Sequence, residues 1–381
     1  MSSSSSSSSS QSLPSQRDDF SASNPTVEAA AVVSDGTEGA MASESAVSVP
    51  AQPAEGTRVA VDFEYGIDVG VHAIRGVRPS MEDHHIIIPF AAESGSGPVD
   101  RNIKPRIAFC GVYDGHGGKR ASEYVSKHLH NVIATSQHFA HRRIREAIEE
   151  GFAKVEEGWM SKAYEGNMED GTTAVVALLV NNLLWVANVG DSECVLVRNG
   201  APTCLSIVHN AKTNHAEEVR VVQAGGRIRR SRLVHPIWAV LNIGVTRSIG
   251  ASSLKAGPNT DGKPSGLIAE PDINCVELTH EDEFLILACD GLWDVLSYQD
   301  AADFVSAALA DGAPAADVSA RLVEYAFKKG SLDNITALVV VFNMAGEVAS
   351  EAGASAVEVA GAADDEGATS GGAVSEADDA P

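Results

Sequence analysis

The sequence is short of several residue types, and each shortage excludes a class of protein. Its five cysteines form no closely spaced pair, so we expect reduced thiols rather than a disulfide framework or a zinc site. Lys and Arg number 28 against 52 Asp and Glu, a formal net charge of -24, whereas nucleic-acid-binding proteins carry a basic surface. No apolar run approaches the roughly 18 to 20 residues of a membrane span. We therefore expect a protein that binds neither nucleic acid nor membrane.

Both ends of the chain are poor in large apolar side chains. Residues 1–60 are rich in Ser, Ala and acids, and residues 345–381 contain acids but no Lys or Arg. Such segments cannot bury enough apolar surface to offset the entropy lost on ordering. We expect two disordered tails around one folded domain at residues 61–344. The N-terminus has no basic region followed by an apolar core, so we expect no secretory signal, a cytoplasmic or nuclear location, and a monomer.

Between the tails, the hydrophobic pattern changes period several times. Short apolar runs predict strands at Val71–Val77, Ile86–Phe90, Ile107–Tyr113, Thr172–Val180, Leu183–Val189, Cys194–Val197, Glu283–Cys289 and Asn334–Phe342. Longer periodic stretches predict helices at Lys119–Val132, Arg142–Tyr164, Gln299–Leu309 and Ala315–Lys328. Asn181-Asn182 lies between two strands and predicts a hairpin turn. Because the helices come in pairs rather than alternating with strands, we expect an α+β fold, an antiparallel sandwich with outer helix layers.

One stretch stands out chemically, Asp114-Gly115-His116-Gly117-Gly118. It directly follows the apolar run Ile107–Tyr113. A carboxylate at the end of a strand can hold a metal ion, glycines let the backbone approach a ligand closely, and an imidazole can move a proton. The same residues also favour an ordinary turn, so this stretch leaves two interpretations open.

Other acids also lie at strand boundaries, namely Glu82, Asp83, Asp191, Asp290, Asp294 and Asp333. A single Asp at such a place is usually a turn residue. Repeated acids at the ends of very apolar strands would surround one cleft if those ends converge. Clustered carboxylates repel unless cations intervene, and Mg²⁺ or Mn²⁺ is the natural partner of oxygen ligands. The pattern therefore suggests two divalent ions that activate water and bind a phosphoryl group.

Eight short motifs in a fixed order resemble the PPM/PP2C family of metal-dependent protein serine/threonine phosphatases. They cover nearly all of the foldable chain, and the resemblance implies two antiparallel sheets packed face to face with helix pairs outside. The motifs are Arg78-Pro79-Ser80-Met81-Glu82-Asp83, Asp114-Gly115-His116-Gly117-Gly118, Gly171-Thr172-Thr173-Ala174, Ala187-Asn188-Val189-Gly190-Asp191-Ser192, Ala224-Gly225-Gly226, Thr246-Arg247-Ser248-Ile249-Gly250, Asp290-Gly291-Leu292-Trp293-Asp294-Val295 and Asp333-Asn334-Ile335-Thr336.

The resemblance also implies roles for individual residues. Asp114 resembles the acid that bridges both metals, and Asp290 and Asp333 resemble the other ligands of one ion. Glu82 and the carbonyl of Gly115 resemble the ligands of the second ion.

Four further residues take roles from the same family pattern. Asp83 resembles a neighbouring acid that holds metal-bound water. Asp191 and Asp294, with Asp290, resemble a weaker third site. Arg78 resembles the phosphate-binding arginine, whose planar fork suits two phosphate oxygens.

The implied reaction is direct attack of a metal-activated water on phosphoserine or phosphothreonine in phosphorylated proteins, without a covalent intermediate. His116 resembles the general acid that protonates the departing alkoxide. Two other functions remain open: a catalytically weak scaffold of the same fold, and a phosphatase of small phosphorylated metabolites. Asp114, Asp290 and Asp333 are all present, which favours the enzyme over the scaffold.

Three places depart from the family pattern. Val208-His209-Asn210-Ala211-Lys212 stands where many members have Asp-His-Lys-Pro, Ala251 replaces an acid, and Glu193 replaces an arginine. The segment Arg229–Ala239 resembles a variable flap. Its arginines are available to an acidic or phosphorylated substrate, but we favour a solvated basic loop.

Overall fold

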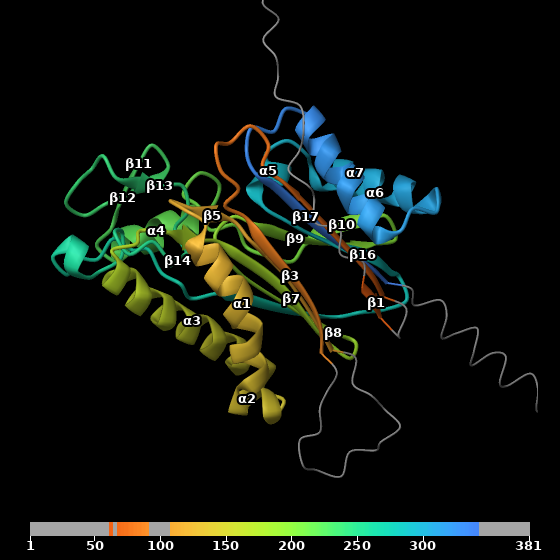
Figure 1. Cartoon of the computed structure of the whole chain (residues 1–381), viewed down its shortest axis with the longest axis horizontal. Helices are drawn as coiled ribbons and strands as arrows, with labels where there is room; N and C mark the ends of the chain where they lie inside the picture. Colours follow the sequence, from red (N-terminus) through yellow and green to blue (C-terminus); the bar gives the residue numbers. More distant parts are fainter. Residues whose placement is uncertain (1–60, 64–66, 91–106, 343–381) are drawn as a thin grey trace, which may run out of the picture. The chain divides into compact units, whose positions relative to one another are not determined.

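The computed structural model describes residues 61–63, 67–90 and 107–342 (Figure 1). All of them fall within the predicted folded domain, whereas the predicted tails at 1–60 and 345–381 lie outside the described residues. The disorder of those tails therefore stays a prediction.

Two antiparallel sheets form the centre of the domain. The first runs in the order β1 (Val61–Phe63), β2 (Ile67–Ile74), β17 (Ile335–Phe342), β16 (Asp282–Ala288), β9 (Glu193–Arg198) and β10 (Ala201–Cys204). The second runs in the order β15 (Asp272–Glu277), β8 (Leu183–Val189), β7 (Ala174–Val180), β4 (Ile107–Tyr113) and β3 (His84–Phe90). Every neighbouring pair in both sheets is antiparallel. The predicted strands Ile107–Tyr113 and Leu183–Val189 match the observed bounds.

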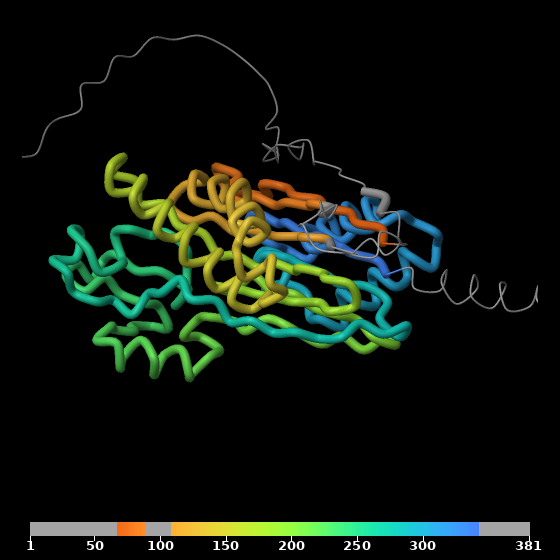
Figure 2. Tube along the Cα trace, turned by 90° about the horizontal axis from the view of Figure 1, so that it is seen from below, coloured from red at the N-terminus to blue at the C-terminus, as the bar shows by residue number. Residues whose placement is uncertain are grey.

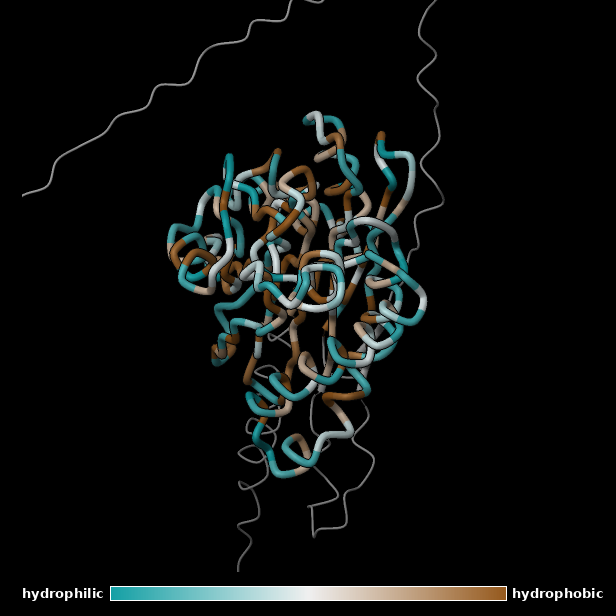
Figure 3. Tube along the Cα trace, turned by 90° about the vertical axis from the view of Figure 1, so that its left-hand side faces the viewer, coloured by the Kyte–Doolittle hydropathy of each residue, from teal (hydrophilic) through white to brown (hydrophobic). Residues whose placement is uncertain are grey.

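Helices cover the outer face of each sheet (Figures 1 and 2). The helices α1 (Arg120–Thr135), α2 (Gln137–Ala140) and α3 (Ile144–Gly166) accompany the five-stranded sheet, and α1 and α3 bury apolar side chains against it. The helices α6 (Tyr298–Ala310) and α7 (Ala315–Lys328) do the same on the six-stranded sheet. Hydrophobic and hydrophilic residues alternate along the chain trace (Figure 3), as they do in elements buried on one face. The predicted α-β-β-α sandwich is therefore confirmed.

The inner faces of the sheets enclose a third apolar core. It contains Val69, Val71, Val112, Leu196 and Leu338, together with three cysteines. All five cysteines are free. No helix among the described residues is long and apolar enough to cross a membrane.

Short-range side-chain chemistry decides several turns and helix ends, including the predicted turn at Asn181-Asn182. Asn181 adopts a left-handed φ of 57° in the hairpin that joins β7 to β8. The side chain of Ser297 accepts a hydrogen bond from the Asp300 amide and so caps α6. The predicted strand at Val71–Val77 instead occupies Ile67–Ile74, because Gly76 has a φ of 60° and turns the chain.

Several small elements were not predicted. Besides β1, β10, β15 and α2, they are α4 (His215–Gln223), α5 (Asp290–Trp293), a 3-10 turn at Pro258–Thr260, a short sheet β14–β6–β5 (Ile249–Gly250, Gly171–Thr172, Gly115–His116) and the sheet β11–β12–β13 (Arg227–Arg229, Arg232–Val234, Asn242–Ile243). The latter is called the flap sheet below. Short elements carry too few periodic positions to stand out from loops.

Candidate active site

A cavity of about 330 Å³ lies where the strand-end acids meet. Eight of the ten predicted site residues line it: Arg78, Glu82, Asp114, Gly115, His116, Asp191, Asp290 and Asp333. Asp83 is buried outside the lining, and Asp294 is exposed outside it. The structure therefore brings most of the predicted set together and leaves these two acids at its margin.

Antiparallel register explains why acids so far apart in sequence converge. Ile335 at the start of β17 pairs with Ile74 at the end of β2, and Ala337 pairs with Ala288 at the end of β16. Asp333 and Asp290 are thereby placed at the same edge of the six-stranded sheet. In the other sheet, Ala174 at the start of β7 pairs with Val189, two residues before Asp191.

The clustered carboxylates resist ionisation. Burial, followed by repulsion from Asp290 and other acids, raises the pKa of Asp114 well above its usual range. Burial and the negative charge of Asp290 raise the pKa of Asp191 to about 7. Burial and the charge of Asp333 raise the pKa of Asp290 to about 6. A cation would remove the repulsion that these shifts express.

The carboxylate oxygens of Asp83 are suited to a site that binds a hard divalent ion. Burial raises the pKa of Asp83 to about 7. One of its oxygens accepts a hydrogen bond from the Thr336 hydroxyl at 2.7 Å, and the other has no partner. Buried carboxylate oxygens that lack donors are the ligands that Mg²⁺ and Mn²⁺ prefer.

The ligand geometry is not preformed in the side chains as they stand. In the part of the chain that the structure describes, no three His, Cys, Asp or Glu side chains are already grouped so as to hold a metal ion. The chemistry of the cavity-lining carboxylates nevertheless fits such an ion.

Glu82 is held by the glycine-rich stretch that follows β4. Its Oε2 accepts a hydrogen bond from the Gly118 amide at 3.2 Å, and its Oε1 accepts one from the Ser80 hydroxyl at 2.8 Å. Gly118 has a φ of 132°, which only glycine adopts readily. The glycines of this stretch therefore serve the site by orienting a carboxylate.

Asn334 is a site residue to which the sequence analysis gave no role. Its Oδ1 accepts a hydrogen bond from the Glu82 amide at 2.8 Å, and its Nδ2 donates to the carbonyls of Arg75 and Ser80 at 2.8 and 2.9 Å. This buried amide thus ties the start of β17 to the loop that carries Arg78 and Glu82. In the sequence, the only sign of this role is a single Asn before a strand, and an Asn in that position also favours a simple turn.

Arg78 forms an ion pair with Asp333 and still has 55% of its side chain exposed. Its guanidinium therefore reaches solvent from a position beside the acids. A carboxylate partner keeps an arginine oriented, while the remaining donors stay available to an anion. The predicted phosphate-binding position is consistent with this geometry.

His116 belongs to β5 of the short sheet β14–β6–β5, and its Nε2 is 3.2 Å from the Ser248 hydroxyl oxygen. Burial, and then the positive charge of Lys255, lowers the pKa of His116 to about 4. The imidazole is therefore neutral at pH 7 in the free protein. A general acid must carry the proton it donates, so this role requires a bound anion to raise the pKa of His116.

The motif Gly171-Thr172-Thr173 supports Asp114 and His116. A Cβ on Gly171 would lie 2.3 Å from the Nε2 of His116, so only glycine fits there. The Thr173 hydroxyl oxygen accepts a hydrogen bond from the Asp114 amide at 3.2 Å. The motif is thus a packing and hydrogen-bonding support for the site.

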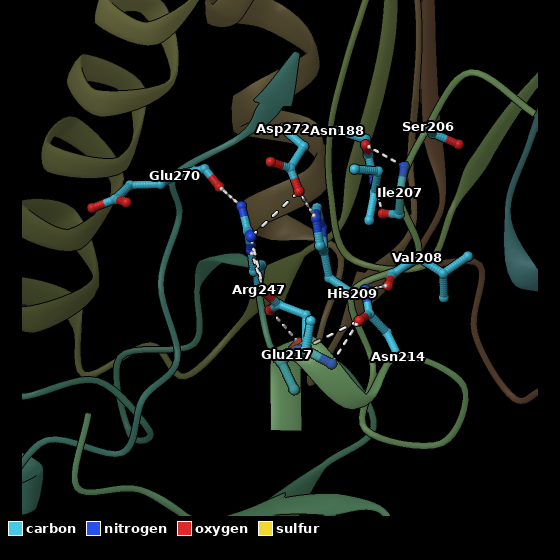
Figure 4. A network of polar contacts seen from close by, with 12 residues as sticks. Asn188, Ser206, Ile207, Val208, His209, Asn214, Glu217, Arg247, Glu270 and Asp272 are labelled. Atoms are coloured by element: carbon cyan, nitrogen blue, oxygen red, sulfur yellow. Dashed lines mark hydrogen bonds and ion pairs between the residues drawn. The ribbon is translucent and has the colours of Figure 1, made fainter. Parts of the chain in front are cut away.

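Residues 208–212, which differ from the family pattern, belong to a polar network (Figure 4). Buried His209 accepts a hydrogen bond from the Gly190 amide through Nδ1 at 3.2 Å, and its Nε2 lies 2.8 Å from Asp272. Asp272 in turn meets Arg247, which pairs with Glu217 of α4. The segment therefore joins the turn before Asp191 to β15 and, through Arg247, to α4.

The remaining departures are accommodated locally. Asn210 hydrogen-bonds Asp191. Ala251 adopts a φ of 56° and its amide donates to the Asp170 carbonyl at 2.9 Å. Glu193 is buried and accepts hydrogen bonds from Tyr298 and Cys204. None of the three substitutions removes a carboxylate from the cavity lining.

The arginines of the flap are exposed, as expected of a solvated loop, but one of them also reaches the cavity. Arg232, together with Ile243, Gly244 and Val245, lines it. The hairpin β11–β12 could not be recognised from its sequence, and the position of Arg232 depends on it.

Comparison with known proteins agrees with this geometry. Residues 67–335 match the family model described as protein phosphatase 2C. The chain is 34% identical over 292 residues to "Probable protein phosphatase 2C 8" of Arabidopsis thaliana, covering 73% of this chain and 80% of that one. It is 33% identical over 243 residues to "Protein phosphatase 2C homolog 2" of Aspergillus fumigatus, covering 63% of this chain and 55%, about half, of the relative.

The solved serine-threonine phosphatase 2C of Toxoplasma gondii has the same fold. It superposes with a TM-score of 0.60 at 21% identity, over 75% of this chain and 99% of that structure. Together, the two-sheet sandwich, the acid-lined cavity and the match to residues 67–335 lead to one conclusion: the chain belongs to the protein phosphatase 2C family.

Proposed function

We propose that this protein is a serine/threonine phosphatase that hydrolyses phosphoserine and phosphothreonine in proteins and depends on Mg²⁺ or Mn²⁺. The observation that carries the proposal is the single cavity lined by Glu82, Asp114, Asp191, Asp290 and Asp333. So many half-buried carboxylates in one place are unfavourable without cations, and two ions, with a third held more weakly, would neutralise them.

Each residue then has a distinct task. A bound divalent ion supplies a Lewis acid that polarises phosphoryl oxygens and lowers the pKa of water. Asp114, Asp290, Asp333, Glu82 and the Gly115 carbonyl are the groups that would hold two such ions. Arg78 binds and orients the phosphate through its guanidinium fork.

His116 acts as the general acid, which donates a proton to the leaving oxygen. A phosphate in the cavity places negative charge near the imidazole, which raises the pKa of His116 from about 4 and lets it carry a proton to the leaving oxygen. No cysteine is among the described residues that line the cavity. The buried Cys289 thiol has a pKa well above its usual value, so a cysteine nucleophile is not supported.

The rival functions receive less support. A scaffold would not need a complete set of carboxylates, and every predicted ligand is present. A phosphatase of small metabolites would use the same ions, and only substrate comparison separates it from a protein phosphatase. A cytoplasmic or nuclear location and a monomeric state stay predictions from composition.

The decisive experiment is a phosphatase assay on the purified full-length protein. We expect hydrolysis of a phosphothreonine peptide with Mn²⁺ or Mg²⁺, none in EDTA, and a loss of at least about 100-fold in Asp290→Asn. Asp303→Asn, which removes the same charge from the exposed face of α6, is the matched control. No hydrolysis with either ion around neutral pH, or full activity in Asp290→Asn, would refute the proposal.

A further inference from the structure

The flap sheet brings a second arginine to the cavity. Among the described residues that line it, Arg78 and Arg232 carry the positive charges, and the acids carry the negative ones. Arg78 lies beside β2 and the acids, whereas Arg232 comes from the flap sheet, whose strands lie apart from the two main sheets (Figure 1). The two cations therefore approach the cavity from different elements.

The register of the flap hairpin places two like charges opposite each other. Arg229 of β11 pairs directly with Arg232 of β12, across a tight turn in which Arg230 and Ser231 adopt φ angles of 51° and 58°. Directly opposed residues in an antiparallel pair share one face, and like charges in that position destabilise the hairpin. Fully buried Leu233 prevents a slip of the register, because a one-residue shift would expose it.

No carboxylate in the described part of the chain relieves this repulsion. Arg232 donates through Nε to the neutral side chain of Asn242, and neither Arg229 nor Arg232 forms an ion pair with a described residue. The other arginine of the cavity is different, since Arg78 pairs with Asp333. The flap pair thus retains most of its hydrogen-bond donors.

Gly244 keeps space open beside the Arg232 guanidinium. A Cβ on Gly244 would lie 3.3 Å from Nη1 of Arg232, which places this glycine directly against the guanidinium. Gly244 itself lines the cavity. The guanidinium therefore lies at the wall of the cavity, next to bare backbone.

We infer that Arg232, opposed by Arg229, binds a second anionic group of the substrate, the carboxylate or phosphate of a residue that flanks the phosphorylated one. An anion between two arginines would cancel their repulsion and form charge-assisted hydrogen bonds with both. Because Arg78 and Arg232 line the same cavity, a residue that flanks a phosphate held at Arg78 would lie near the flap sheet. The inference rests on the proposed phosphatase activity and makes Arg232 a residue that determines specificity.

The test compares three versions of one phosphothreonine peptide, with Ala, Glu or phosphoserine within three residues of the phosphothreonine. Dephosphorylation of the threonine is followed by mass spectrometry with Mn²⁺ present. In the wild type we expect kcat/KM for the Glu and phosphoserine peptides to exceed that for the Ala peptide about tenfold, mainly through KM. Arg232→Gln should reduce this preference to about twofold, and Arg232→Glu should abolish or reverse it.

Controls separate the possible outcomes. Arg321→Gln removes an exposed positive charge from α7 and should keep the tenfold preference. If Arg232→Gln does not fold, Arg229→Gln takes its place. The wild-type preference is then also measured in ~0.5 M salt, which should weaken it by screening the attraction between the flap arginines and the anionic group. A preference for only one of the acidic peptides would identify the anion that the flap binds.

An equal kcat/KM for all three peptides in the wild type would overturn the inference and leave the proposed function intact. A preference that persists in Arg232→Gln would overturn it as well. Failure to hydrolyse any peptide would overturn both the proposed function and the inference.

Discussion

Replacing Asp290 with Asn should stabilise the metal-free protein while it removes activity. In the folded chain, burial and the charge of Asp333 raise the pKa of Asp290 from 3.8 to about 6. In the unfolded chain the group returns to its ordinary value. The folded state therefore binds more protons than the unfolded state between these two pKa values, and its stability falls as the pH rises through that window.

The size of the effect follows from the pKa shift. Roughly two pKa units correspond to about 3 kcal/mol of destabilisation once Asp290 is fully ionised. Part of this cost is desolvation, which a buried amide also bears, so we expect Asn to recover about 1 to 2 kcal/mol. For a domain of this size that raises the Tm by about 3 to 6 °C.

The measurement is thermal unfolding of wild type and Asp290→Asn in EDTA at pH 8 and at pH 4.5. The gain should be full at pH 8 and fall to about a third at pH 4.5, where the folded-state carboxyl is protonated but the unfolded-state carboxyl, with its pKa of 3.8, is already mostly ionised. Added Mn²⁺ should raise the Tm of the wild type more than that of the variant, since the ion binds the folded state. A variant that melts below the wild type at pH 8, or a gain that is equal at both pH values, would refute the reasoning.

Three further predictions concern the groups around the cavity. Burial raises the pKa of Glu217, but hydrogen bonds from Arg220 and Arg247 outweigh burial, so the pKa is lowered overall. Glu217→Gln should therefore reduce the free energy of unfolding, measured with denaturant, by about 3 kcal/mol. Glu218→Gln, at the next residue, should change that free energy by under about 0.5 kcal/mol. Gly171→Ala should reduce kcat at least about tenfold, because the new methyl group would displace the His116 ring, and wild-type turnover in this variant would contradict that account. His116→Gln should slow hydrolysis of a phosphothreonine peptide more than that of p-nitrophenyl phosphate, whose leaving group needs no proton; an equal loss for both substrates would argue against a proton donor.

Much of the architecture was predictable because local chemistry decides it. Most side chains of the strands Ile107–Tyr113 and Leu183–Val189 are buried, and both strands read as continuous apolar runs. Asn181 and Ser297 mark a turn and a helix start through side-chain chemistry that needs no distant partner. The order of the family motifs likewise lies in the sequence itself, and it pointed to the carboxylates Glu82, Asp114, Asp290 and Asp333.

The flap shows what local patterns cannot supply. Residues 227–243 contain four arginines and three very short strands, a composition that also fits a solvated loop. Only the pairing of Arg229 with Arg232, and the packing of Leu233, bring one of these arginines to the cavity. A one-residue change in register would turn the same side chain to the opposite face.

The sequence by itself determined which elements form and which acids end them, because hydrophobic period, turn residues and caps act over a few positions. Tertiary structure alone decided which of those acids share a cavity, since antiparallel register places the ends of strands far apart in sequence side by side. It also placed Asp83 and Asp294 outside the lining, gave Asn334 its bridging role, and kept the His116 imidazole neutral. These outcomes depend on burial and on distances between distant segments, and no short stretch of sequence encodes either.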